Sequence, residues 1–503
     1  MKNKIIKDIT MKGKQIVAID VGSSNVVIAV GSLMEDGCVD IMGIVSEPVT
    51  GIRAGRIDNG EQVARAIALA KAKIEKQLGV HITEVYAGIS GDYVRCSHVE
   101  EHVYVQEEGV SNRDIEELDR RMQCVKAPDD SELIVSSEPL RYKVDDKEVG
   151  EPNGAYGNRL SATYNFVLCD KKMRDRLSAC LKSQGITVKE FVPNTTISHL
   201  GVATSDEIQD GTVVINLGAQ LTDVTVLQKG KVTHIASIPM GANDINTDIT
   251  SLGIGKYVED LKIGYGSALA DRCDDDLIVF PQKYHIMVKS LLRRNLVIAI
   301  EARLVDIAGW VNREIKEAKC GSRFRPVVLL TGGGSRMRDI EELFKREIAC
   351  EDVRVVYPEY GITPESMEHI SSQANATVVS LMLYGAKRGS CSVIVKPQGP
   401  TVSQPGSTPT STPAPEPQRP AQNTTTIPPV KAVEEQPKPQ QPAEPEQVVE
   451  TPTTDVGEEI IDVGPDVEKG RKKGLFGGRF TKWVEKTTSA ISKSMSADDE
   501  QNF

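Results

Sequence analysis

The stretch "VAIDVGSSNVVIAVG", residues 17–31, decides how the rest of the chain is interpreted. Two apolar runs flank a turn of glycine and small polar residues, which predicts two buried strands joined by a tight hairpin. Asp20 ends the first strand, and the turn consists of Gly22, Ser23, Ser24 and Asn25. Backbone N–H groups and hydroxyls in such a turn suit a phosphate, and Asp20 can hold a hydrated Mg²⁺. An ordinary hairpin turn without a ligand is the alternative.

The same pattern returns in "TVVINLGAQLTDVTVLQKGKV", residues 212–232, as strand, glycine turn and strand. This second copy indicates an internal duplication. The two loops would face one another across a cleft and bind a phosphate chain from both sides. A third glycine stretch, "RPVVLLTGGGSRMRDIEELFKRE", spans residues 325–347. It predicts a buried strand, a turn open to a planar ligand, and a helix whose N-terminus favours anions. The alternative to an internal duplication is that the hairpins at residues 17–31 and 212–232 are unrelated.

Helices and strands alternate elsewhere in the same region. "IDNGEQVARAIALAKAKIEKQLG", residues 57–79, predicts a helix that ends at Gly79 as its C-cap. "EVYAGIS", residues 84–90, predicts a strand, and residues 294–318 predict a long helix. The fold class is therefore α/β.

Composition excludes several kinds of protein. The net charge of −11 over 503 residues predicts no general affinity for nucleic acid. Nine cysteines without a C-x-x-C pair predict reduced thiols in the cytosol. The N-terminal residues lack an apolar run of signal-peptide length, and no segment is apolar over the 18 residues that a membrane span needs. Any association with a membrane is therefore expected to be peripheral.

The C-terminal part differs sharply in composition. Residues 397–465 hold 16 of the 26 prolines, so we expect residues 397–469 to be a disordered linker. Residues 469–495 then contain eight Lys or Arg and one acid. On a helical wheel, the apolar residues of this tail fall within an arc of about 120°. Residues 470–495 are therefore predicted to form an amphipathic helix that lies in the membrane interface.

The expected membrane contacts are of two kinds. The apolar contacts are Phe476, Phe480, Trp483, Val484 and Ile491, and the cationic contacts to anionic lipid are Arg479, Lys482 and Lys486. Docking of this helix on the chain's own core, or on another protein, is the alternative.

The chain carries three motifs in a fixed order: D-x-G-[ST], a second glycine hairpin, and T-G-G-G-S. This order resembles that of the actin, Hsp70 and sugar-kinase superfamily of ATP-binding folds. Within it, the chain most resembles the FtsA family of bacterial cell-division proteins. The segments that carry this resemblance, in FtsA order, are "VAIDVGSSNVVIAVG", "SEPLRYKVDDKEVGEPNGAYGNRLSATYNFV", "IPMGANDINTDI", "EDLKIGYGSA" and "IEARLVDI". The tail fits the family as well.

The resemblance implies an actin-like (duplicated, ribonuclease H-like) fold with four subdomains. Their expected bounds are 11–92 and 186–207 for subdomain 1A, 93–185 for 1C, 208–244 and 323–396 for 2A, and 245–322 for 2B. It also implies actin-like protofilaments of the chain with itself, and binding of the C-terminal tail of the tubulin-like ring protein FtsZ. The chain would lie at the cytoplasmic face of the inner membrane, bound peripherally to anionic lipids, and recruit later division proteins.

The resemblance further implies ATP and Mg²⁺ as cofactors, with Asp20 ordering the Mg²⁺ through water. The nucleotide-binding residues it implies are Asp20, Gly22, Ser23, Ser24, Asn25, Asn216, Gly218, Ala219, Gln220, Gly241, Asn243, Glu259, Lys262, Gly332, Gly333, Gly334, Ser335 and Met337. Glu259 and Lys262 correspond to the family's ribose and adenine contacts. A surface helical pair at i and i+3 is the alternative for these two.

One loop departs from the family pattern. The second phosphate loop usually reads D-x-G-G-G-T-x-D, whereas residues 216–223 read N-L-G-A-Q-L-T-D. Losing the strand-end carboxylate removes a charge that helps to hold Mg²⁺ and to orient attacking water. Our hypothesis is that the chain binds ATP and has at most weak ATPase activity, with no catalytic residue assigned. A chain that binds no nucleotide is the harsher alternative.

Three rival functions share parts of this pattern. A small-molecule kinase needs a carboxylate base in the cleft, and no motif singles one out. A PilM-like scaffold of type IV pili shares the fold, but the linker and the amphipathic tail argue against it. An Hsp70-like chaperone needs a β-rich domain where this chain has the linker.

Overall fold

The computed structural model describes residues 14–395, apart from residue 107 and residues 282–287, 322–323 and 371. The first sheet contains β1 (Lys14–Val21), β2 (Asn25–Leu33), β3 (Val39–Pro48), β7 (Glu84–Ile89) and β12 (Thr187–Pro193). The second contains β13 (Thr212–Leu217), β14 (Thr222–Gln228), β15 (Lys231–Ile238), β18 (Val327–Thr331) and β19 (Val353–Val355). The predicted linker and tail lie outside the described residues.

The two sheets have the same topology. Their strand orders are β12-β7-β1-β2-β3 and β19-β18-β13-β14-β15. In each sheet three consecutive strands form an antiparallel meander, and the other two strands run parallel to its first strand. The predicted α/β class and the internal duplication are therefore confirmed.

Both hairpins form because buried apolar runs meet across a short polar turn. In the first, Ile16–Ile19 and Val26–Val30 are buried and pair in register, with Ile19 opposite Ile28. The turn closes through the Gly22 N–H, which donates to the Asn25 carbonyl (3.0 Å). In the second, the Gly218 N–H donates to the Leu221 carbonyl (2.8 Å).

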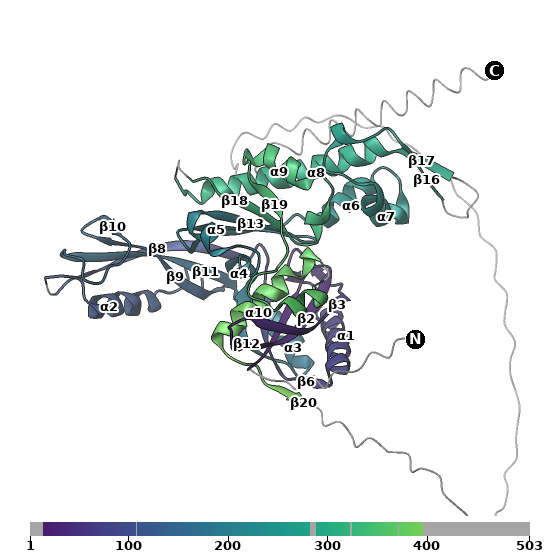
Figure 1. Cartoon of the computed structure of the whole chain (residues 1–503). Helices are drawn as coiled ribbons and strands as arrows, with labels where there is room; N and C mark the ends of the chain where they lie inside the picture. The colour runs from purple at the N-terminus through teal and green to yellow at the C-terminus, as the bar shows by residue number, and fades with distance from the viewer. Residues whose placement is uncertain (1–13, 107, 282–287, 322–323, 371, 396–503) are drawn as a thin grey trace, which may run out of the picture. The chain divides into compact units, whose positions relative to one another are not determined.

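Three helices pack on the first sheet and complete what we call the first lobe. They are α1 (Gly60–Leu78), α3 (Lys171–Ser183) and α10 (Ala376–Arg388), and α10 lies along β1 and β2 (Figure 1). Asn59 caps α1 by accepting from the Gln62 N–H, and Gly79 ends it in the left-handed region with φ 69°. The predicted C-cap of this helix is therefore confirmed. β20 (Val393–Val395) pairs with β6 (Val80–Ile82).

Four helices share the apolar core of the second sheet and complete what we call the second lobe. They are α6 (Ala242–Thr250), α7 (Val258–Tyr265), α8 (Arg293–Glu317) and α9 (Ile340–Ile348). Asp248 on α6 is buried and accepts two hydrogen bonds from Arg303 on α8, at 2.6 and 2.9 Å. The hairpin of β16 (Leu277–Pro281) and β17 (Val288–Leu292) precedes α8. The long helix expected over 294–318 is thus confirmed within one residue.

A separate four-stranded sheet is inserted between β7 and β12. It has the order β10-β9-β11-β8 and contains β8 (Val94–Tyr104), β9 (Glu132–Val144), β10 (Lys147–Val149) and β11 (Arg159–Asp170). With α2 (Asn112–Gln123) it forms its own small apolar core. It contacts β15, where Asn165 donates to the Val232 carbonyl (3.1 Å). The proposed division into four subdomains stays a prediction.

Short elements make the remaining connections. They are β4 (Ile52–Arg53) and β5 (Arg56–Ile57), α4 (Asn194–Ile197), α5 (Ser205–Asp210), and 3₁₀ turns at Gly255–Tyr257, Ala270–Arg272, Gly333–Arg336, Pro364–His369 and Gln373–Asn375. All nine cysteines are free thiols. Among the described residues, no helix combines the length and the apolar character needed to cross a bilayer.

The third glycine stretch differs from its prediction. β18 is a buried strand as expected, but a 3₁₀ turn follows the glycines, and α9 begins only at Ile340. Asp339, just before it, is left-handed with φ 61°. The anion-favouring helix N-terminus expected at this turn is therefore displaced along the chain.

Candidate functional site

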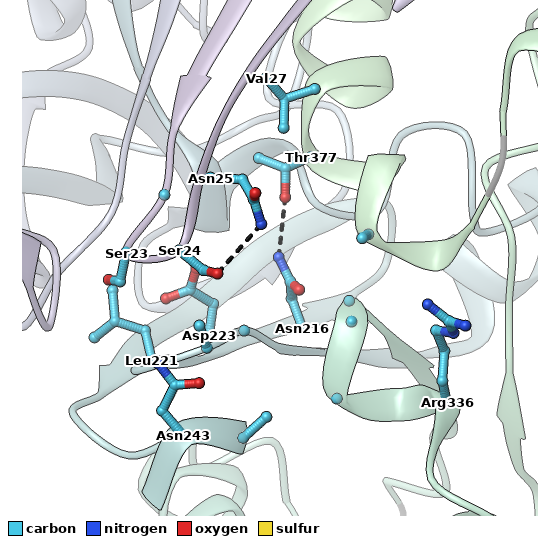
Figure 2. A pocket seen from close by; sticks show the side chains of 18 of the residues that line it. Ser23, Ser24, Asn25, Val27, Asn216, Leu221, Asp223, Asn243, Arg336 and Thr377 are labelled. Atoms are coloured by element: carbon cyan, nitrogen blue, oxygen red, sulfur yellow. Dashed lines mark hydrogen bonds between the residues drawn. The ribbon is translucent and has the colours of Figure 1, made fainter. Parts of the chain in front are cut away.

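A cavity of about 590 Å³ lies between the two lobes and collects most of the predicted site residues. Fifteen of the eighteen line it: Asp20, Gly22, Ser23, Ser24, Asn25, Asn216, Gly218, Ala219, Asn243, Glu259, Lys262, Gly332, Gly333, Gly334 and Met337. This volume is typical of small-molecule sites. Figure 2 shows the first hairpin turn, with Ser23, Ser24 and Asn25, across from Asn216 and Asn243.

The first hairpin turn supplies hydroxyl and amide groups to one wall of this cavity. Ser24 Oγ accepts from Asn25 Nδ2 (3.3 Å), and Ser23 Oγ accepts from the Gly55 N–H (3.3 Å). Both serine hydroxyl protons stay free to rotate toward a ligand oxygen. A Cβ at Gly22 would lie 3.2 Å from the Asn25 carbonyl oxygen, so glycine keeps this turn tight.

Two carboxylates lie in the floor of the cavity, where Asp223 is buried and Asp20 is half-buried. Asp20 Oδ1 accepts a hydrogen bond from Asn194 Nδ2 (3.0 Å). Asp223 accepts from Ser90 Oγ at 2.7 and 2.9 Å and from Ser237 Oγ at 2.6 Å. These contacts keep both side chains fixed in the cavity floor.

Burial raises the pKa of Asp20 to about 6, with Asp223 adding to the rise and the Asn194 hydrogen bond opposing it. Burial also raises the pKa of Asp223, against the hydrogen bonds from Ser237 and Ser90. A cation held between two such acids would favour their charged forms.

The second hairpin turn forms the facing wall. The Ala242 and Asn243 N–H groups donate to the Gly218 (2.9 Å) and Ala219 (2.7 Å) carbonyls, which fixes this turn against the start of α6. Asn216 Nδ2 donates to Thr377 Oγ1 (3.0 Å), as the dashed line in Figure 2 shows. The strand-end position that holds an acid in the family therefore bonds to α10 of the first lobe.

Three predicted residues do not line the cavity. Gln220 turns toward Ala54, whose N–H donates to Gln220 Oε1 (2.9 Å). Gly241 packs behind the second turn, where a Cβ would lie 2.7 Å from the Gly218 oxygen. Ser335 is buried, and its Oγ donates to the Gly332 carbonyl (2.8 Å), so it holds the third turn together instead of facing a ligand.

The third glycine turn and α7 surround the remaining side of the cavity. Gly332 has φ 85°, and a Cβ there would lie 2.2 Å from Asn216 Oδ1, so only glycine fits. Gly333 is exposed, and a Cβ there would meet nothing closer than Ala374 Cβ at 3.9 Å. The Lys262 side chain is only 9% exposed and pairs with the 55% exposed Glu259 at 2.9 Å. The surface-pair alternative is thus wrong for Lys262, although the ion pair itself is present.

Several lining residues escaped the sequence analysis, among them Ser90, Asn194, Asp223, Arg336 and Thr377. Asp223 is the last residue of the quoted loop 216–223, so its position in the motif was the available signal. Ser90 follows β7, Asn194 begins α4 and Thr377 lies in the first turn of α10, so three separate segments of the first lobe supply them. No local motif marks them.

The comparisons with known proteins agree with this arrangement. A model for "Cell division protein FtsA" matches residues 213–380, and one for the "SHS2 domain inserted in FTSA" matches residues 91–168, which span the inserted sheet. The cell division protein FtsA of Pseudomonas aeruginosa is 28% identical over 384 residues, 75% of this chain and 91% of that protein. FtsA of Escherichia coli K12 is 26% identical over 386 residues, covering 74% and 90%.

One solved structure supports the fold independently of close sequence similarity. A PilM–PilN type IV pilus biogenesis complex aligns with a TM-score of 0.52 at 15% identity, covering 74% of this chain and 98% of that one. At this identity the likeness concerns the fold alone. The duplicated sheets, the inserted domain and the matches over three quarters of the sequence agree that this chain belongs to the FtsA family of actin-like cell division proteins.

Proposed function

We propose that this chain binds ATP with Mg²⁺ in the cavity between its lobes and polymerises into actin-like protofilaments. In this proposal, residues 470–495 hold the filament on anionic lipids at the cytoplasmic face of the inner membrane. The chain binds the FtsZ C-terminal tail, tethers the division ring there and recruits later division proteins. The observation that carries the nucleotide part is the cavity of two facing hairpin turns above the carboxylates of Asp20 and Asp223.

The residues present fit a Mg²⁺–ATP complex. Asp20 and Asp223 are hard oxygen ligands of the kind Mg²⁺ prefers, directly or through water. Asn194 Oδ1 is buried and has no hydrogen-bond partner among the described residues, which suits a bound water. When bound, the metal ion would neutralise phosphate charge, and the hydroxyls of Ser23 and Ser24 would donate to phosphate oxygens.

The adenosine side fits as well. Gly333 offers exposed backbone to a planar ring, and Met337 and Lys262 line the same cavity. The Lys262 ammonium has one of its donors on Glu259, which leaves the others for a ligand acceptor. Membership of the FtsA family supports the partner assignments, and the composition of the tail supports the lipid assignment.

Replacing Asp20 by Ala is expected to weaken Mg²⁺-dependent ATP binding by roughly tenfold or more, because it removes the strand-end carboxylate of the cavity floor. The measurement is calorimetric titration of ATP into the full chain, with Mg²⁺ and with a chelator. Asp210→Ala, which removes an exposed acid at the end of α5, is the control and should bind like the wild type. A wild-type chain that gives no saturable ATP binding would contradict the nucleotide proposal.

The PilM-like scaffold is the second candidate. The PilM–PilN structure shows the fold alone, so it does not favour a pilus partner. A vesicle-binding test of the tail separates the two candidates, because only the tethering function requires that segment.

A further inference from the structure

Loop 216–223, which we call the clasp loop, departs from its family pattern at Asn216 and Gln220. Both of these side chains bond across the cavity to the first lobe. We infer that the clasp loop holds the two lobes together and that Asn216 and Gln220 set how fast a bound nucleotide leaves. This inference rests on the proposed nucleotide binding and adds a means of controlling it.

Gln220 makes a contact in the middle of the clasp loop. Its Oε1 accepts from the Ala54 N–H at 2.9 Å, in a partly buried position. Ala54 sits in the turn between β4 and β5, a segment of the first lobe between β3 and α1. A glycine at position 220, as in the usual family loop, has no side chain to make this bond.

The turn that contains Ala54 is bonded to the rest of the first lobe, so the Ala54–Gln220 hydrogen bond links that lobe to the clasp loop. Tyr93 donates to the Gly55 carbonyl (3.1 Å), and the Gly55 N–H donates to Ser23 Oγ (3.3 Å). Gly55 has φ 78°, and a Cβ there would lie 2.1 Å from the Ser90 carbonyl oxygen. Ala54 is itself left-handed with φ 44°, a conformation that orients its N–H toward the second lobe at a conformational cost.

Asn216, the first residue of the clasp loop, makes a second contact. Its Nδ2 donates to Thr377 Oγ1 at 3.0 Å, and Thr377 lies in the first turn of α10, which packs on the first sheet. At the last residue of the loop, Asp223 accepts from Ser90 of the first lobe. The clasp loop therefore holds the first lobe at three separate places.

A nucleotide enclosed by both lobes leaves only when they separate, and separation breaks these three contacts. One net hydrogen bond corresponds to a factor of roughly five in an equilibrium constant. Removing one contact should therefore raise the opening equilibrium, and the release rate that depends on it, by roughly fivefold. Asn216 and Gln220 thus lengthen the residence of the ligand.

Release of labelled nucleotide from the full chain tests the inference. The protein is loaded with N-methylanthraniloyl-ATP and Mg²⁺, and the fluorescence decay is followed after adding excess ATP. Gln220→Gly and Thr377→Val are each expected to release the label roughly fivefold faster. Gln220→Glu keeps a side-chain acceptor and should stay near the wild-type rate, as should Gln123→Ala in the inserted domain. Wild-type release rates in Gln220→Gly and Thr377→Val would overturn the inference.

A second readout is independent of nucleotide. Amide hydrogen exchange of the peptide containing Ala54 should be slow in the nucleotide-free full chain and faster in Gln220→Gly, with unchanged exchange in the inserted sheet. If labelled ATP does not bind, the proposed function fails, and the exchange result still decides whether the clasp exists. Equal exchange in both proteins would show that the Gln220 contact does not hold the lobes.

Discussion

A chain cut after Lys396 is expected to stay in the supernatant when anionic vesicles are pelleted, whereas the full chain pellets with them. The removed residues include the basic segment 469–495, with eight Lys or Arg and one acid. A helix with an aromatic apolar arc and a cationic face binds the membrane interface, and each basic residue near anionic lipid adds roughly 1 kcal/mol. The measurement is the pelleted fraction at low salt.

Two double variants distinguish the contribution of the apolar arc to vesicle binding from the contribution of net charge. Phe480→Glu with Trp483→Glu places two acids within the arc, and we expect this variant to lose vesicle binding. Thr481→Glu with Ser489→Glu makes the same charge change outside the arc, and we expect much of the binding to remain. Equal loss in both variants would mean that charge alone attracts the tail, and would contradict an inserted helix.

Steady-state ATP hydrolysis by the wild-type chain is expected to lie near background, and Asn216→Asp is expected to raise it by roughly 100-fold. The substitution restores a carboxylate at the end of β13, where it can orient attacking water and support the metal ion. Asp223 occupies a different place, on β14, and its hydrogen bonds from Ser90 and Ser237 fix its orientation, so it does not supply a carboxylate at the end of β13. The measurement is phosphate release by the full chain with Mg²⁺–ATP.

Asn243→Asp is the matched control, because it adds the same charge to the same cavity at a different place. It should leave hydrolysis near background. Robust hydrolysis by the wild-type chain that disappears on Asp20→Ala would contradict the slow-hydrolysis hypothesis.

Local patterns predicted the parts of the fold that local sequence determines. The two hairpins, the strand β18 and the C-cap at Gly79 follow from short-range periodicity and glycine placement. The start of α9 was not predicted by the local pattern, because the residues after Gly332 form a 3₁₀ turn before the left-handed Asp339. Backbone conformation inside a glycine-rich turn depends on contacts such as that of Ser335 with the Gly332 carbonyl.

The candidate site was predictable where the cavity-lining residues lie in the glycine loops. It was not predictable where they come from segments far away in the sequence. Ser90, Asn194 and Thr377 are brought to the cavity by three separate segments of the first lobe, so their place there depends on the tertiary structure. Gln220 belongs to the recognised loop, but its side chain leaves the cavity for Ala54, a contact that requires both lobes.

The central claim is that nucleotide-dependent assembly gathers many weak tails on a membrane. Linked tails bind with higher avidity than single ones, because each further tail binds at a high effective concentration. The most direct test is pelleting of the full chain with anionic vesicles over a range of protein concentrations, with Mg²⁺–ATP and without nucleotide. The account predicts that ATP shifts binding to lower protein concentration and makes it steeper. A full chain that remains in the supernatant at low salt under both conditions would contradict it.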